Sequence, residues 1–420
     1  MKRWTIASAL LLALACTAVV AGTATAPEPL PTEAFARLPR LAGLQLSPDG
    51  QRFAGLLNQD ERTALVVRDL AGGRMKALLV TDNKVFTFNW VHWAHDDRLV
   101  VSLKYPSRRG HVDTSETRLL AISPAGGEPL NLVKAAFFSR ERNQQIQDRV
   151  IDWMPDDGHH LLLQLQESAQ AIEPGVYQVD VDTGQRRLVQ RAMNDVMEWT
   201  ADAQHRVRVA LAMSKGGEFS VRVREPDGQD WRTLWTFGLH DDKAVWPLGF
   251  GRDPQQLYVR AEHAGRMAVF AVRLDQPGLP RRLLLAHADR DVGGELLHAP
   301  ASGEVLGLRT ASQENDDGEV RSELWDAGWQ AQAKAIDKAL PERYNRLHDI
   351  SRDETRYLVY SSGNGRPGEY YLGDRRTGDL VLLGETYPEL SAEQLAGKHA
   401  ASIRARCPRC AAWSTRSARR

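Results

Sequence analysis

The sequence predicts an all-β fold, a seven-bladed β-propeller of four-stranded antiparallel blades that follows an N-terminal signal peptide. Three observations indicate this fold. A turn motif of the kind seen at Ser47-Pro48-Asp49-Gly50 recurs about every 50 residues. Each repeat holds two hairpin patterns, which is typical of a propeller blade. The 420 residues also lack the alternating long helical segments of an α/β enzyme.

Residues 1–26 have the pattern of a secretory signal peptide. Lys2 and Arg3 precede an apolar run over residues 6–20, and small residues follow through Ala26. Two alternatives remain open: an uncleaved membrane anchor, for which the run is short, and a lipoprotein modified at Cys16, for which the preceding residues are an imperfect match. We expect export, to the periplasm, with no membrane span after cleavage. Residues 27–40 form a lead-in segment.

The predicted propeller occupies residues 41–388, and one turn marks each blade. The markers are Asp49, Asp96, Asp156, Asp202, Asp253, a degenerate copy at Gly303, and Asp353. A large apolar residue usually stands three positions before the marker: Leu46, Trp93, Trp153, Trp199, Phe250 and Ile350, with Pro300 in the degenerate copy. Strand-forming residues follow each turn, so each marker predicts the hairpin of the first two strands of a blade.

A second hairpin recurs after each marker. Its turns are expected at Gly72-Gly73, Gly126-Gly127, Thr183-Gly184, Asp227-Gly228, Pro277-Gly278 and Thr377-Gly378, and the weak sixth unit retains Leu324-Trp325-Asp326-Ala327-Gly328. A sheet of four short strands cannot bury both faces alone, whereas blades packed around an axis cover one another. A β-sandwich with coincidental repeats is the competing interpretation, and seven regularly spaced turns disfavour it.

Composition narrows the possible partners. Lys and Arg total 54, as do Asp and Glu, so no overall charge favours nucleic acid or a membrane surface. Beyond Cys16 the cysteines are Cys407 and Cys410, so no disulfide is expected to hold the main domain together.

Two sequence patterns associated with enzymes do not predict catalysis in this chain. Residues 363–368 match the dinucleotide pattern Gly-x-Gly-x-x-Gly, but they join two predicted strands, and Pro367 with no helical period after it favours a hairpin loop. The nucleophile elbow Gly-x-Ser-x-Gly is absent from the sequence: the one pair of glycines four apart, Gly303 and Gly307, encloses Val305. No catalytic triad is identifiable.

Metal chemistry is not predicted either. His159 and His160 lie in a predicted turn between strands, where adjacent side chains point to opposite sides, which suits solvent exposure better than chelation. Cys407 and Cys410 have zinc or redox spacing, but no second pair follows and no βαβ pattern surrounds them. We therefore assign no catalytic, cofactor-binding or metal residue and no cofactor.

Several runs resemble the N-terminal propeller of exported bacterial serine peptidases of the prolyl oligopeptidase and acylaminoacyl-peptidase family. The runs are residues 35–56, 150–157, 175–184 and 247–254, and with the marker turns they extend over nearly the whole mature chain. The resemblance implies a propeller that covers a C-terminal α/β-hydrolase domain and filters its substrates by size, while a Ser-Asp-His triad in the second domain performs the chemistry. No residue of this chain matches that triad.

The tail, residues 389–420, is expected to be a linker remnant and a basic, disordered segment. After Glu393 it has no acidic residue, whereas six arginines and two cysteines lie close together. Our hypothesis is that the reading frame departs near Cys407, so that the product is truncated before the hydrolase domain. A basic arm for nucleic acid or anionic lipid is the alternative for this tail.

Two functions remain. In the first, the chain is the non-catalytic, substrate-gating portion of a prolyl-oligopeptidase-like serine peptidase, inactive alone and completed by a separately encoded α/β-hydrolase chain. In the second, it is a stand-alone periplasmic propeller that binds a protein or peptide at its loop face. The sequence identifies neither the substrate nor the ligand.

Overall fold

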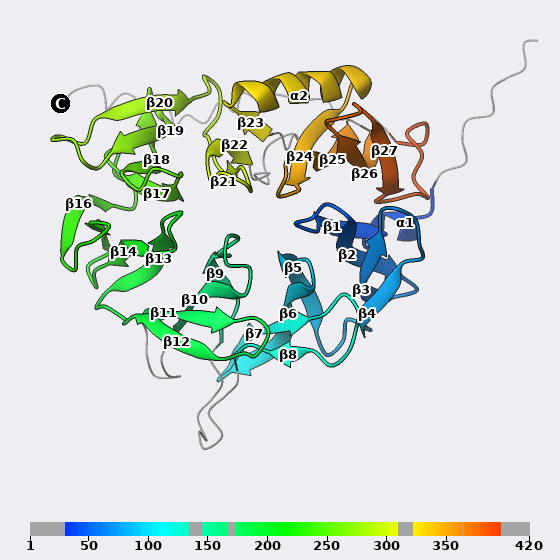
Figure 1. Cartoon of the computed structure of the whole chain (residues 1–420), viewed down its shortest axis with the longest axis horizontal. Coiled ribbons are helices and arrows are strands. Elements are labelled where there is room, and N and C mark those ends of the chain that lie inside the picture. The colour runs from blue at the N-terminus through cyan, green and yellow to red at the C-terminus, as the bar shows by residue number, and fades with distance from the viewer. Residues whose placement is uncertain (1–29, 134–144, 167–172, 310–321, 364, 396–420) are drawn as a thin grey trace, which may run out of the picture.

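The chain folds into seven antiparallel sheets arranged in a ring around one axis (Figure 1). The computed structural model describes residues 30–133, 145–166, 173–309, 322–363 and 365–395. A short helix, α1 (Glu33–Ala36), precedes the first blade. No helix among these residues combines the length and the apolar character that a membrane crossing requires. The seven antiparallel sheets confirm the predicted seven-bladed β-propeller.

Each blade uses strands that are consecutive in the sequence. Blades 1 to 3 consist of β1 (Leu41–Leu46), β2 (Arg52–Gln59), β3 (Arg62–Asp69), β4 (Lys76–Thr81), β5 (Thr87–His95), β6 (Arg98–Arg109), β7 (Val112–Ile122), β8 (Leu130–Asn131), β9 (Arg149–Asp152), β10 (His160–Gln166), β11 (Pro174–Asp180) and β12 (Arg186–Gln190). Blades 4 to 7 consist of β13 (Val196–Ala201), β14 (Val207–Met213), β15 (Glu218–Arg224), β16 (Trp231–Gly238), β17 (Val245–Phe250), β18 (Gln256–His263), β19 (Arg266–Arg273), β20 (Arg281–Leu285), β21 (Glu295–His298), β22 (Val305–Arg309), β23 (Ser322–Leu324), β24 (Tyr344–Ile350), β25 (Arg356–Gly363), β26 (Arg366–Asp374) and β27 (Leu380–Glu385).

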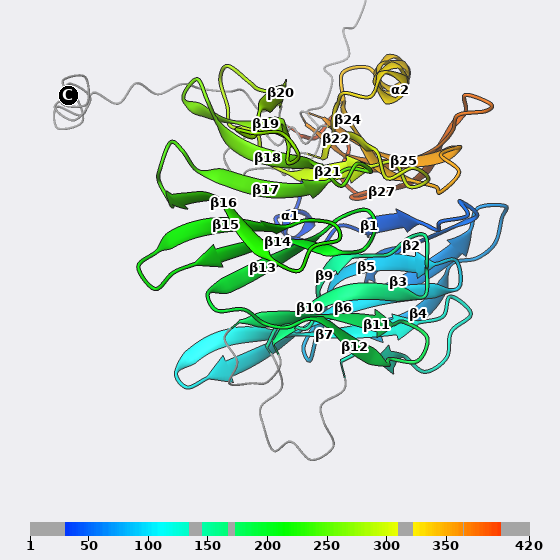
Figure 2. The ribbon, with the colours of Figure 1, turned by 60° about the vertical axis from the view of Figure 1, so that its left-hand side comes forward.

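The antiparallel order gives the ring two distinct faces. The first strand of each blade lies nearest the axis and runs toward its marker turn (Figure 1). We call the face that carries the marker turns the turn face. The opposite face, where the second strand connects to the third and one blade connects to the next, is the loop face. Figure 2 shows the blades from the side. In every blade the register shifts between the first and second strands, and such bulges increase the local twist.

The hydrophobic core is divided into layers between successive blades. The apolar residue before a marker turn belongs to such a layer: Trp93 is 4% exposed and packs with Leu65 and Leu99 of blades 1 and 2, and Trp199 is 3% exposed between blades 3 and 4. Phe250 packs likewise between blades 4 and 5. The repeat therefore favours a large apolar residue before its turns because this residue fills the space between two sheets.

The marker turns also fasten neighbouring blades by hydrogen bonds. In blade 1 the amide of Asp49 donates to Asp96 Oδ1 of blade 2 at 2.8 Å, and Arg52 Nη2 donates to the Asp96 carbonyl at 2.7 Å. In blade 7 Arg356 occupies the position of Arg52 and donates to the Gly50 carbonyl at 2.7 Å. The turn motif thus specifies contacts between blades as well as the hairpin within a blade.

Blade 6 differs from the predicted four-stranded unit. In the described residues its sheet has three strands, and α2 (Ala327–Ala339) lies on the outer rim, where the other blades place their fourth strand (Figure 1). The second hairpin expected at residues 324–328 is therefore wrong: Asp326 instead caps the helix, because its side chain accepts from the Trp329 amide at 2.8 Å. Trp329 and Ile336 of α2 are buried against β24 and β25.

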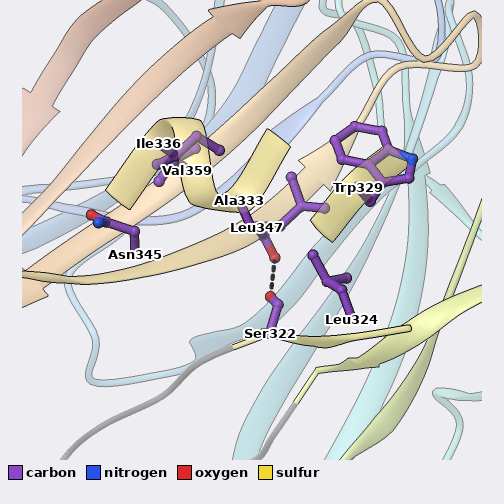
Figure 3. Close-up of a pocket in the computed structure, with 8 residues that line it drawn as sticks. All are labelled: Ser322, Leu324, Trp329, Ala333, Ile336, Asn345, Leu347 and Val359. Carbon is purple, nitrogen blue, oxygen red and sulfur yellow. Dashed lines mark hydrogen bonds between the residues drawn. The ribbon is translucent and has the colours of Figure 1, made fainter. Parts of the chain in front are cut away.

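Helix α2 covers a small cavity of about 20 Å³, room for roughly one water. Ser322, Trp329, Ile336 and Asn345 are among its lining residues, and Ser322 Oγ donates to the Leu347 carbonyl at 3.2 Å (Figure 3). The cavity is a packing gap between the helix and the sheet and is too small for an organic ligand.

The ring closes between blades 7 and 1 without exchange of a strand. Leu46 donates its amide to Asp349 Oδ2 at 2.7 Å, and Gly43 donates to the Tyr370 hydroxyl at 3.2 Å. The Arg40 amide donates to the Thr386 carbonyl at 2.6 Å, so the chain enters the first blade beside the point where it leaves the last. An apolar layer that includes Leu44 completes the closure.

Candidate functional site

Three features of the described residues are candidates for function: a basic cluster near the axis, a cleft on the loop face, and a histidine–aspartate cluster on the turn face. The basic cluster consists of Arg309 at the loop-face end of β22, and Arg346 and His348 on β24, the innermost strand of blade 7. Arg309 Nη2 donates to the His348 carbonyl at 3.0 Å. Arg346 Nη2 lies 3.3 Å from His348 Nδ1.

Two tyrosines hold the basic cluster in place. The guanidinium carbon of Arg346 lies 5.2 Å from the centre of the Tyr360 ring, a cation–π contact. The His348 ring meets the Tyr370 ring edge-on at 5.5 Å. Leu347, which lies between Arg346 and His348, packs in the apolar layer that includes Trp329 and Ile336 of α2. Because successive side chains of a strand point to opposite faces, Arg346 and His348 both lie on the other face of blade 7.

The electrostatics of this region are dominated by burial and by the two arginines. Burial, followed by the charges of Arg346 and Arg309, lowers the pKa of His348 to about 3. Across the axis on blade 2, burial and the charge of Arg309 lower the pKa of His92 to about 4. Burial raises the pKa of Asp349 to about 6. The hydrogen bonds from the amides of Leu46 and Ile350 favour the charged form and so lower this pKa, but burial has the larger effect. At neutral pH both histidines are therefore uncharged, and the arginines carry the positive charge.

The loop face holds a cleft of about 530 Å³ between blades 3 and 4. Ile146, Met197 and Met213 contribute exposed apolar side chains, which are 47%, 41% and 41% exposed. Glu173 and Lys215 add charges of opposite sign to its lining. Flexible methionines beside polar groups suit a surface that adapts to differing peptide side chains.

On the turn face His95, His159 and Asp182 place their ligand atoms within 4.8 Å of one another. His159 Nδ1 lies 2.7 Å from Asp182 Oδ2, and Arg98 donates to Asp182 Oδ1 through Nε at 2.8 Å. His95 Nδ1 accepts from the Asp97 amide at 3.2 Å, which leaves the proton of a neutral ring on Nε2, the nitrogen that faces Asp182. A metal ion would need a lone pair on His95 Nε2, where the neutral ring carries its proton, and the positive charge of Arg98 would repel it. This cluster therefore suits an ion-pair network between blades 2 and 3 better than a cation site.

The residues considered from the sequence fall in different places. His159 and His160 bind different carboxylates, since His160 Nδ1 lies 2.9 Å from Asp157 Oδ2. The glycine-rich run at residues 363–368 lies in the connection from β25 to β26, whose register pairs Gly363 with Arg366, so the hairpin interpretation is confirmed. The signal peptide, Cys16, Cys407, Cys410 and the basic tail lie outside the described residues.

Sequence reasoning missed the basic cluster. Arg346 and His348 stand two residues apart just before the marker turn at Asp353, and this alternation of polar residues was a usable signal. Arg309 gave no local signal, because its proximity to His348 results from the packing of blade 6 against blade 7.

Comparison with known proteins points to one group of peptidases. The chain is 24% identical over 405 residues to dipeptidyl aminopeptidase BIII of Pseudoxanthomonas mexicana, and the match covers 93% of this chain and 54% of the relative. No protein-family profile matches the chain. This chain therefore spans about half the length of the curated relative that it matches.

The fold of a solved peptidase structure matches that of this chain. A puromycin-hydrolyzing peptidase of Mycobacterium tuberculosis superposes with a TM-score of 0.50 at 16% identity, over 85% of this chain and 55% of that one. A prolyl endopeptidase structure gives a TM-score of 0.49 at 15% identity, over 84% and 52% of the two chains. The sequence match to part of a dipeptidyl aminopeptidase, together with the fold shared with the puromycin-hydrolyzing peptidase, confirms the resemblance to the propeller of prolyl-oligopeptidase-like peptidases.

Proposed function

We propose that this chain is the non-catalytic, substrate-gating portion of a prolyl-oligopeptidase-like serine peptidase, and that it does not hydrolyse peptides by itself. The observation that carries the proposal is the match over 93% of this chain to 54% of a dipeptidyl aminopeptidase. The sequence also lacks the elbow that presents a nucleophilic serine in α/β-hydrolases.

In this proposal a hydrolase acts at the loop face. Both ends of the propeller lie there, joined by the hydrogen bond from Arg40 to Thr386, so a domain connected to either end would begin beside this face. The cleft between blades 3 and 4 opens on the same face. A separately encoded α/β-hydrolase chain is the proposed partner, and the proposed location is the periplasm, on the basis of the predicted signal peptide.

The test uses the purified chain, a chromogenic peptide substrate and a serine-directed phosphonate probe. We expect neither hydrolysis nor labelling. Addition of a hydrolase chain encoded beside this gene, if it carries Gly-x-Ser-x-Gly, is expected to restore turnover. Labelling of a serine in this chain would overturn the proposal.

A second function is favoured by the cleft itself: a stand-alone module that binds a peptide or protein at the loop face. Exposed Met197 and Met213 would contact the ligand in this case. Saturable peptide binding that is weakened by Met213→Lys but not by Met75→Lys would support it. Met75, which is 36% exposed, is the control because it lines a different pocket, with Leu41 and Leu57, and not this cleft.

A further inference from the structure

The basic cluster of Arg309, Arg346 and His348 contains buried polar hydrogens for which the described residues provide no well-placed acceptor. Arg309 Nε, Arg346 Nε and His348 Nε2 are all buried and make no hydrogen bond of good geometry among the described residues, although the backbone of Leu44 lies close enough to the His348 ring to favour its charged form. Because Arg346 can only donate, His348 Nδ1 accepts from it, and the ring proton is on Nε2. All three unpaired atoms are therefore donors.

Unpaired buried donors destabilise a folded protein. A buried polar group without a partner loses its hydrogen bonds to water without replacement, and the loss is larger when the group is charged. Other buried arginines of this chain have a carboxylate partner: Arg208 is 1% exposed and bonds Asp202 Oδ2 at 3.0 Å, although its Nη2 is also unpaired among the described residues, and Arg343 pairs with Glu369. In the described part of the chain no carboxylate lies within ion-pair distance of Arg309 or Arg346.

The carboxyl group associated with this cluster does not neutralise it. The oxygens of Asp349 accept the amides of Leu46 and Ile350, at 2.7 and 2.9 Å, and so are committed to the closure of the ring. Arg309 interacts with Asp349 only through space, and burial raises the pKa of Asp349 to about 6. Two like charges remain, and the charge of Arg309 contributes with burial to lowering the pKa of Arg346.

We infer that Arg309, Arg346 and His348 form an oxyanion-binding site near the loop-face half of the axis, which takes a carboxylate of a peptide or a free inorganic oxyanion. Guanidinium groups present N–H donors in a geometry that matches carboxylate and phosphate oxygens, and a neutral imidazole adds one directed donor. Arg309 lies at the end of β22 and Arg346 near the start of β24, both toward the loop face, where the cleft also opens. The peptide source rests on the proposed gating function, whereas the inorganic source does not.

Calorimetric titration of the full chain at low ionic strength tests the site with three probes: a capped alanine tripeptide with a free C-terminal carboxylate, the same peptide as its amide, and inorganic phosphate. We expect the acid to bind and the amide not to bind. Arg309→Gln and Arg346→Gln are each expected to weaken binding at least tenfold. The control Arg282→Gln removes one exposed charge from β20 and should leave binding unchanged.

The three probes distinguish the two sources of the oxyanion. Phosphate binding without peptide binding, lost in Arg309→Gln, would support the site and assign it to a free anion, independently of the gating proposal. Unchanged binding in both arginine variants, or no binding of any probe by the wild-type chain, would overturn the inference. Circular dichroism spectra confirm that each variant is folded, and Arg309→Lys, which keeps the charge but loses the forked donors, should bind with intermediate affinity.

Discussion

Two charged clusters of this propeller differ in how their charges are satisfied. Around Asp182 one carboxylate accepts from Arg98 and His159, which joins blade 2 to blade 3. Around Arg309 and Arg346 two cations face a neutral histidine, and three buried donors have no partner in the described structure. Charge at the turn face is therefore used within the protein to hold blades together, whereas charge near the axis is left available to another molecule.

The largest effect is expected where a paired charge is fully buried. Asp202→Ala would leave Arg208 as an uncompensated cation, because both side chains are 0–1% exposed. Loss of one member of such a pair costs about 3–5 kcal/mol of the free energy of unfolding. Urea denaturation measures it. The control Asp49→Ala, at the same turn position of blade 1, removes bonds to Ser47 and Gln51 without isolating an arginine and should cost about 1 kcal/mol. Equal losses in the two variants would contradict the distinction.

A smaller effect is expected at the cluster of Asp182, which is partly open to water. Asp182→Asn is expected to cost about 1 kcal/mol, because the side chains of Asp182 and His159 are 30% and 63% exposed and water screens their attraction. Unfolding in urea measures the loss, and Asp113→Asn, whose partner Arg108 is also exposed, is the matched control with no expected change.

The same pair predicts a pH dependence. The hydrogen bond with Asp182 raises the pKa of His159. The stabilisation that charged His159 contributes to the fold is therefore present below pH 6.5 and is lost as the pH rises through the pKa of His159 in the folded protein. For Asp182, burial alone would raise the pKa, but bonds from His159 and Arg98 lower it, so its contribution is present above pH 3.8 and is lost in stronger acid. NMR titration should show a lower pKa of His159 in Asp182→Asn, and an unchanged value would contradict the pairing.

The smallest effect on stability is expected near the axis. Arg346→Met removes a partly buried charge that has no carboxylate partner among the described residues. The loss of its contacts with Tyr360 and His348 is therefore offset, because a charge no longer has to be desolvated. We expect the free energy of unfolding to change by less than about 1 kcal/mol. Thermal unfolding measures it, and a loss as large as that of Asp202→Ala would mean that the protein itself compensates Arg346.

The repeat made most of the fold predictable. The seven turns and the apolar residue before them are local patterns, and each corresponds to a hairpin and to a side chain between blades. Blade 6 was the exception, because residues 324–328 suit a tight turn and a helix start equally well. The helical spacing of Trp329, Ile336 and Leu340 beyond Asp326 was the signal that distinguishes them.

The candidate site was far less predictable. The alternation of Arg346 and His348 is visible in the sequence, but the absence of a compensating carboxylate among the described residues depends on which side chains of other blades come near. Arg309 reaches His348 across 39 positions in the chain, from a blade whose pattern is the weakest. Local patterns specify the strands, whereas the arrangement of charges around the axis depends on all seven blades together.

The closure of the ring has a consequence for synthesis on the ribosome. Leu46 and Asp349, which join blade 1 to blade 7, are 303 residues apart. At the usual rate of protein synthesis, about 5–20 residues per second, about 15–60 s pass between synthesis of the first blade and synthesis of the last blade that covers its apolar side. During that interval Leu44 and Phe53, both fully buried in the finished ring, are exposed to water. The nascent chain is therefore most vulnerable to aggregation at the surface that later becomes its final joint.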